Sequence, residues 1–159
     1  MKTIASFTID HIKLLTGLYV SRIDRVGEET VTTFDIRMTR PNMEPVMDTA
    51  AAHALEHLGA TYLRSDAEWG NKIVYFGPMG CRTGFYLILA GNVTSEEALP
   101  LVKRMMEFIA AYEGDIPGAS AVQCGNYLDL NLPMAKWHAK KYISEVLTDV
   151  KSERLHYPE

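Results

Sequence analysis

Five consecutive residues, His53-Ala54-Leu55-Glu56-His57, hold the side chains of this chain with the clearest capacity for chemistry. The two histidines are four residues apart, so in a helix they stand one turn apart and can present ring nitrogens to one metal ion at about 2.0–2.1 Å. The order H-x-x-E-H is that of an inverted zinc-binding motif, in which a carboxylate stands beside two imidazoles. Two solvated histidines on an exposed helix face would give the same short pattern, so the hypothesis needs a third ligand.

The third ligand is predicted from the cysteines, of which the chain has two. Cys124 lies in the turn-rich segment 117–126, where a loop can bring a thiolate back to the helix. An ordinary buried cysteine is the alternative, because free cysteine is among the most buried residue types. Together with His53 and His57, Cys124 would supply two imidazoles and one thiolate, which suit Zn, Fe(II) or Co(II) better than magnesium or calcium. A fourth position would stay free for water or substrate.

Two more residues are candidate proton carriers. Glu56 would lie beside the ion without being an obvious ligand, as a general base next to a metal-bound substrate must. Cys81 follows the turn-rich sequence Gly77-Pro78-Met79-Gly80, and it could act as a second acid/base if a nearby cation, Arg37 or the metal, stabilises its thiolate. A solvated surface glutamate and a structural cysteine are the alternatives.

Length and composition predict one compact domain over residues 1–159, since 159 residues that are 47% hydrophobic can bury one core. The formal charge is -4 and the basic residues are dispersed, which argues against nucleic acid or an anionic membrane as a partner. No apolar run approaches the roughly 20 residues that cross a bilayer, and the first residues do not resemble a secretion signal. We therefore expect a cytoplasmic protein, whose cysteines are free thiols or ligands rather than a disulfide.

The pattern of apolar residues predicts an antiparallel hairpin of strands 17–26 and 30–39, followed by two central strands at 73–76 and 85–91. Cys81 would lie in the loop between the central strands. Because side chains alternate along a strand, the second strand should have an apolar row on one face and a polar pair on the other. These sets are Phe34, Ile36 and Met38 against Asp35 and Arg37.

Three helices are predicted. Asp48 or Thr49 can cap the first, which runs to about Ser65 and has its histidine side roughly opposite its apolar side. Packing of the apolar side on a sheet would leave the histidines facing outward, so another element must cover them if the site is to exclude water, and a second subunit is a reasonable candidate. A capping box at 94–97 opens the second helix. The third follows Asn131-Leu132-Pro133, with an apolar stripe that continues to Val150.

Taken together, the motifs resemble one enzyme family. Besides the histidine motif, they are Ser6-Phe7-Thr8-Ile9-Asp10-His11, Phe34-Asp35-Ile36-Arg37, Arg40-Pro41-Asn42, Pro78-Met79-Gly80-Cys81-Arg82-Thr83-Gly84 and Gln123-Cys124-Gly125. In this order and spacing, the chain resembles the S-ribosylhomocysteine lyase family over nearly its whole length. The resemblance implies an α+β fold, with an antiparallel sheet packed against helices in a two-layer sandwich related to the inverted zinc metallopeptidases. It also implies a homodimer with active sites at the interface.

The resemblance further implies the reaction. The family cleaves the thioether of S-ribosylhomocysteine to homocysteine and 4,5-dihydroxy-2,3-pentanedione, a precursor of a bacterial quorum-sensing signal, by metal-assisted carbonyl migration and β-elimination. Its metal is Fe(II), with zinc or cobalt able to occupy the site, and no organic cofactor is needed. The positions carried over are His53, His57 and Cys124 as metal ligands, Glu56 and Cys81 as the acid/base pair, Ser6, His11 and Arg37 around the ribose, and Arg64 at the homocysteine end.

Two other functions remain open. The histidine motif is shared with metal-dependent peptidases, which would need an acidic third ligand such as Glu113 or Asp115 and a peptide-binding chamber for which this chain has little room. A non-catalytic metal-binding module that has kept the ligands is the other. Ala52, Ala54 and Gly77 depart from the commonest family pattern, but none is a proposed reacting group.

Overall fold

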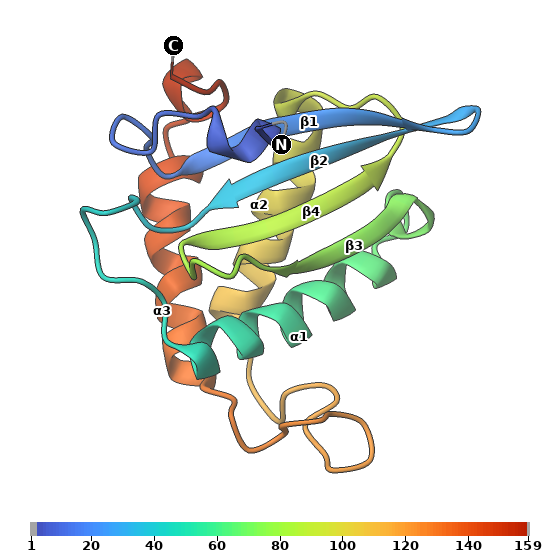
Figure 1. Cartoon of the computed structure of the whole chain (residues 1–159). Helices are drawn as coiled ribbons and strands as arrows, with labels where there is room; N and C mark the ends of the chain where they lie inside the picture. The colour runs from blue at the N-terminus through green and yellow to red at the C-terminus, as the bar shows by residue number, and fades with distance from the viewer. Residues whose placement is uncertain (1–2, 159) are drawn as a thin grey trace.

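The computed structural model describes residues 3–158, which form a four-stranded antiparallel sheet and three α-helices (Figure 1). The strands are β1 (Gly17–Val26), β2 (Glu29–Arg37), β3 (Ile73–Pro78) and β4 (Gly84–Ala90), in the spatial order β1-β2-β4-β3. The helices are α1 (Thr49–Ser65), α2 (Ser95–Ala111) and α3 (Leu132–Tyr142). The helices pack together on one face of the sheet, which gives the two-layer α+β arrangement that was predicted.

The alternation of side chains along β2 separates the core from a polar layer. Phe34 pairs with Leu87 and Ile36 with Phe85, and all four side chains are fully buried against the helices. Asp35 and Arg37 point to the other face, which we call the outer face of the sheet. The two faces of this strand are therefore as predicted, although the strand ends at Arg37, two residues earlier than expected.

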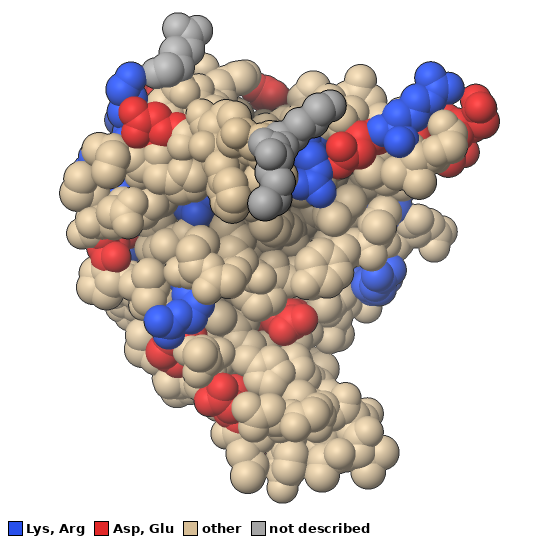
Figure 2. Space-filling view, in the orientation of Figure 1, with Lys and Arg blue, Asp and Glu red and all other residues tan. Residues whose placement is uncertain are grey.

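The β1–β2 hairpin projects from the body of the molecule (Figure 1). Val26 pairs with Glu29, and Gly27 in the turn between them has a φ of 63°, a conformation that glycine adopts without strain. Basic and acidic side chains are interspersed along this hairpin and over the rest of the face seen in Figure 2. No helix within residues 3–158 combines the length and the apolar composition that a bilayer span requires.

Helix α1 begins where the sequence predicts. The Asp48 side chain accepts a hydrogen bond from the backbone N–H of Ala51 at 2.8 Å, which satisfies one of the free donors at the helix start. On the sheet side, Gly59 meets the ring of Phe76 so closely that an added Cβ would lie 2.5 Å from a ring carbon. This close approach to β3 fixes the helix, and so it fixes the direction of the side that carries the histidines.

Helix α2 opens on the predicted capping box. The Thr94 hydroxyl accepts from the Glu97 backbone N–H at 3.2 Å, and the Glu97 carboxylate accepts from the Thr94 backbone N–H at 2.8 Å. The reciprocal bonds explain why the helix starts at Ser95 rather than at the later Pro100.

Loss of this cap has a measurable cost. Thr94→Ala removes one of the two reciprocal bonds and is expected to lower the free energy of unfolding by about 1 kcal/mol, or Tm by roughly 2–4 °C for a chain of this size. Scanning calorimetry measures the shift. Ser65→Ala is the control, because the Ser65 hydroxyl donates to the Thr61 carbonyl within its own helix and its loss should change Tm little. Equal shifts for the two variants would mean that the cap adds no stability of its own.

The end of the third helix differs from the prediction. After Tyr142 the chain continues as a π-helical turn, Ile143–Leu147, in which the Thr148 N–H donates to the Ile143 carbonyl at 2.9 Å. The extra residue in this turn rotates the chain out of the helical repeat. The predicted apolar stripe is therefore buried as far as Val146, whereas Val150 lies outside it and is exposed. The extension of the stripe to Val150 was wrong.

One buried histidine of α3 makes the stability of the fold depend on pH. Burial lowers the pKa of His138, Asp48 opposes this shift and Lys141 adds to it. In the unfolded chain the imidazole has a pKa of about 6.5. Just below that pH the unfolded state therefore binds a proton, whereas the buried ring of the folded state stays neutral. Stability contributed by the neutral ring is thus present above the unfolded pKa and is lost as the pH falls toward the folded one.

We expect His138→Phe to lose less stability than the wild type between pH 7.5 and pH 5.5. Urea unfolding of chelator-treated proteins at both pH values measures this, because the remaining histidines then contribute equally to both proteins. Parallel losses in the two proteins would show that His138 is not the group that titrates.

Candidate metal centre

Helix α1 and the loop that follows α2 bring together the three predicted ligands. The ligand atoms of His53, His57 and Cys124 all lie within 4.8 Å of one another, and each residue is half-buried. Cys124 Sγ is 3.4 Å from His53 Nε2, although the two residues are 71 positions apart in the chain. Two ligands on a tetrahedral ion, with bonds of the usual Zn–S and Zn–N lengths, would be separated by about 3.5 Å. The spacing of this pair therefore fits a shared ion.

Both imidazoles are oriented by the ends of the same loop. His53 Nδ1 lies 2.8 Å from the Asp129 carbonyl, and His57 Nδ1 lies 2.7 Å from the Pro117 carbonyl. A carbonyl oxygen can only accept, so each Nδ1 carries the proton and each Nε2 keeps its lone pair. This is the usual outer support of a histidine that ligates a metal. The donor set and its support thus fit a divalent transition metal.

An acidic third ligand has no counterpart near the histidines. Among the residues that the structure describes, His53, His57 and Cys124 form the one cluster of three or more His, Cys, Asp or Glu side chains with metal-binding spacing. Glu113 and Asp115 are both exposed and lie outside it. Within the described residues, the two histidines are therefore not joined by the acidic third ligand that a metallopeptidase would require.

Glu56 lies on α1 between the two histidines and is half-buried. Its position in the first turns of the helix, beside His57 and opposite the apolar side, follows directly from the helical repeat.

Cys81 belongs to a second cluster, which is built around a buried ion pair on the outer face of the sheet. Arg37 donates to Asp35 Oδ2 at 2.6 Å from one terminal nitrogen and to Thr83 Oγ1 at 2.6 Å from the other. The second nitrogen is also 3.9 Å from Cys81 Sγ, and Cys81 Sγ is 3.1 Å from Thr83 Oγ1. A fixed positive charge therefore stands next to an exposed thiol.

Burial and the charge of the partner together set the pKa values of Asp35 and Arg37. Burial is the larger effect on Asp35. It raises the pKa of Asp35, and the charge and hydrogen bond of Arg37 oppose that rise. Burial also lowers the pKa of Arg37, but the Asp35 carboxylate outweighs this and leaves the guanidinium pKa raised. Arg37 is consequently a permanent cation in a nearly water-free environment.

The turn that carries Cys81 is held on several sides. Arg82 has a φ of 60°, an uncommon conformation for a residue with a side chain, and its N–H donates to Met79 O at 2.9 Å. Its carbonyl accepts from Met47 N, just before α1, at 3.0 Å. The strained turn is thus fastened both to itself and to the segment that leads into the histidine helix, which keeps the thiol in one place.

The predicted substrate-binding residues are divided between two regions. His11 is half-buried, with Nδ1 2.8 Å from the Ile9 carbonyl, and it lies near enough to Asp35 to oppose slightly the rise that burial causes in the pKa of that carboxyl. Ser6 is half-buried in the 3-10 turn Ala5–Phe7. Arg64, in contrast, lies two turns beyond His57 and donates to the carbonyls of β3 residues Ile73 and Val74, at 2.8 and 3.1 Å. Both guanidinium ends of Arg64 are therefore engaged with the sheet edge.

Sequence reasoning missed several groups of this region. The carbonyls of Pro117 and Asp129 have no side-chain signal, because any residue type supplies a carbonyl. Thr83 was part of a motif but had no assigned contact. Asp35 was predicted to share a face with Arg37, and that i,i+2 spacing in a strand was the signal available for the ion pair.

Comparison with known proteins agrees with this geometry. The family model for S-ribosylhomocysteinase (LuxS) matches residues 4–153. A protein from Clostridium beijerinckii named S-ribosylhomocysteine lyase is 58% identical over 99% of both chains. A protein of the same name from Finegoldia magna is 58% identical over 100% of both chains. Another, from Phocaeicola vulgatus, is 56% identical over 99% of this chain and 98% of its own. The similarity extends over nearly the whole chain and is not limited to a shared fragment. The chain therefore belongs to the S-ribosylhomocysteinase (LuxS) family.

Proposed function

We propose that this protein cleaves the thioether of S-ribosylhomocysteine to homocysteine and 4,5-dihydroxy-2,3-pentanedione. The observation that carries the proposal is the convergence of His53, His57 and Cys124 in a chain of this family. The relatives named S-ribosylhomocysteine lyase support the substrate. The diketone product would serve as a precursor of a quorum-sensing signal, and the homocysteine would return to the activated methyl cycle.

The chemistry explains why proton carriers are needed. A thioether leaves poorly until a carbonyl stands two carbons away, so the carbonyl of the open-chain sugar must first migrate along the chain through enediols. Each migration takes a proton from one carbon and delivers a proton to its neighbour. A final proton abstraction next to the relocated carbonyl then expels homocysteine thiolate by β-elimination.

We assign Glu56 and Cys81 to these proton transfers. Glu56 extends from the same helix as the two histidine ligands, and Cys81 extends from the β3–β4 turn, so the two groups approach a bound sugar from different elements. Arg37 stabilises the thiolate form of Cys81, which lets that sulfur accept a proton and return it. General acid–base catalysis of this kind contributes about 10²- to 10⁴-fold to a rate.

The metal is proposed to be Fe(II), held by His53, His57 and Cys124, with zinc or cobalt able to take the same ligands. When bound, the ion acts as a Lewis acid on the substrate carbonyl. The two neutral imidazoles and the thiolate leave room for an oxygen of the substrate beside Glu56. No organic cofactor is proposed.

Substrate binding is proposed to use both regions of the site. Ser6, His11 and Arg37 would surround the ribose, since His11 and Arg37 both lie next to Asp35 on the outer face of the sheet. Arg64, which donates to the Ile73 and Val74 carbonyls, would meet the homocysteine end with its remaining N–H donors, since a guanidinium suits a carboxylate.

We also propose a homodimer with the active sites at its interface. Large apolar side chains are exposed in two segments: Phe7 is 75% exposed in the N-terminal turn, and Val122 and Leu128 are 97% and 81% exposed in the loop that carries Cys124. Exposed apolar groups in such numbers favour contact with another protein surface. Sedimentation equilibrium should then give twice the mass of one chain.

Three broader assignments complete the proposal. The chain functions as one domain over residues 1–159, supported by the continuous hydrophobic cluster that joins the sheet to all three helices. It functions in the cytoplasm, where two free cysteines remain reduced. The H-x-x-E-H order supports a relation of the fold to the inverted zinc metallopeptidases.

An anaerobic free-thiol assay tests the function. Purified protein is loaded with Fe(II), its metal content is measured, and S-ribosylhomocysteine is added; homocysteine should be released in many turnovers per site. Peptide hydrolysis without thiol release would favour a peptidase. Full metal content with neither activity would indicate a non-catalytic metal-binding module.

A further inference from the structure

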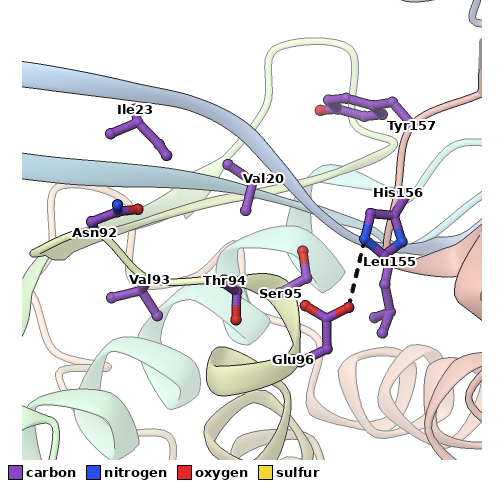
Figure 3. A pocket seen from close by; sticks show the side chains of 10 residues that line it. All are labelled: Val20, Ile23, Asn92, Val93, Thr94, Ser95, Glu96, Leu155, His156 and Tyr157. Carbon is purple, nitrogen blue, oxygen red and sulfur yellow. Dashed lines mark ion pairs between the residues drawn. The ribbon is translucent and has the colours of Figure 1, made fainter.

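The C-terminal tail crosses from one face of the sheet to the other beside β1. Leu155 is buried and belongs to the core between the sheet and the helices, whereas Tyr157 lies on the opposite side of the β1 ribbon (Figure 3). Arg154 donates to the Thr16 carbonyl at 2.8 Å, just before β1 begins. The tail is thus anchored by both apolar and polar contacts before it reaches the outer face.

On that face, Tyr157 adds a hydrogen bond to the buried ion pair. Its ring stacks on Tyr19, with centroids 4.8 Å apart and planes inclined by 15°. Its hydroxyl donates to Asp35 Oδ2 at 2.9 Å, the same oxygen that accepts from Arg37 at 2.6 Å. Burial raises the pKa of the Tyr157 phenol well above its ordinary value, so the hydroxyl keeps its proton and remains a donor.

The contacts continue without a break from the tail to the reactive thiol. Asp35 fixes one terminal nitrogen of Arg37, and the planar guanidinium then sets the position of the other. That second nitrogen contacts Thr83 and approaches Cys81. A shift of the Asp35 carboxylate would therefore rotate the guanidinium and move the cation away from the sulfur.

We propose that Tyr157 is a positioning residue, which acts through Asp35 and Arg37 to hold a positive charge beside Cys81. The inference rests on the proposed acid/base role of Cys81. Tyr157 lies beyond residues 4–153, the part that the family model matches, so the family resemblance assigns it no role. The tail is thereby part of the active-site support rather than a passive chain end.

The test compares two tyrosines that each lose only a hydroxyl. Tyr157→Phe keeps the ring stack and removes the bond to Asp35. Tyr142→Phe is the matched control, because its hydroxyl also donates over 2.9 Å, to the Gly17 carbonyl, but bonds neither Asp35 nor Arg37. The measurements are the alkylation rate of Cys81 by iodoacetamide at fixed pH, resolved from Cys124 by peptide mass spectrometry, together with kcat, KM, metal content and Tm.

We expect Tyr157→Phe to lower the alkylation rate of Cys81 and kcat by about five- to tenfold, as for loss of one ordinary hydrogen bond, with metal content unchanged. Tyr142→Phe should lower Tm at least as much and leave Cys81 reactivity as in the wild type. Wild-type kcat and alkylation in Tyr157→Phe, with only a lower Tm, would overturn the proposal and leave Tyr157 a purely structural residue.

A double-mutant cycle tests the route through Asp35. Asp35→Asn removes the carboxylate charge, and addition of Tyr157→Phe to it should then change the alkylation rate no further. Independent, additive losses would overturn the route. If the wild type releases no thiol from S-ribosylhomocysteine, the proposed function fails, whereas the alkylation comparison still decides what Tyr157 does to Cys81.

Discussion

Metal-loaded Glu56→Gln protein is expected to release homocysteine about 10²- to 10⁴-fold more slowly than the wild type, and Cys81→Ala should show a loss of similar size. Each substitution removes a proton carrier and leaves the three metal ligands in place. Glutamine keeps the size of the Glu56 side chain but cannot take up a proton near neutral pH. The free-thiol assay measures the rate, and elemental analysis of the same samples shows whether the metal is retained.

Glu113→Gln is the matched control for Glu56. It also removes one carboxylate, at an exposed position outside the metal cluster, so turnover and metal content should equal those of the wild type. Wild-type turnover in Glu56→Gln would exclude this carboxylate from the reaction. Loss of metal in Glu113→Gln would instead support the peptidase alternative, in which an acidic residue is the third ligand.

Cys124→Ala is expected to weaken metal binding by at least about 100-fold, because even a supporting group outside the ligand set commonly contributes 10- to 100-fold. The remaining pair, His53 and His57, would bind an ion with two ligands from one helix. Elemental analysis after gel filtration, and competition with a chelator, measure the loss. Turnover should fall with the metal content.

The two cysteines control for each other. Each variant removes one thiol by the same Cys-to-Ala change. Cys81→Ala should keep full metal content, whereas Cys124→Ala should lose metal. Since a ligand that binds only the folded state stabilises it, added metal should raise the Tm of Cys81→Ala and not that of Cys124→Ala. Full occupancy in Cys124→Ala would exclude this sulfur as a ligand.

Local features of the fold were predictable because their causes lie within a few residues. The cap at Asp48 and the capping box at Thr94 each depend on a side chain and a backbone N–H no more than three positions away. The two faces of β2 follow from alternation alone. The end of α3 was not predictable in this way, since no breaker residue marks the π-helical turn at Ile143–Leu147.

The candidate site divides along the same line. His53 and His57 are one helical turn apart, so their proximity follows from the sequence. Cys124 was predictable from its chemistry, because the chain offers few thiols, although no local rule brings it back over 71 residues. Tyr157 had no signal at all: its contact with Asp35 joins residues 122 positions apart, and only tertiary structure creates it.

The bonds from the Pro117 and Asp129 carbonyls to the imidazoles have a consequence for the choice of metal. Neither ring can flip without leaving a carbonyl unpaired, so the rotational freedom of both rings is given up when the chain folds and not when an ion arrives. Exchange of one divalent ion for another then requires no remodelling of the loop. For the proposed metal, iron, zinc and cobalt would then meet the same ring positions, and discrimination among them would be left to their intrinsic affinities and relative supply.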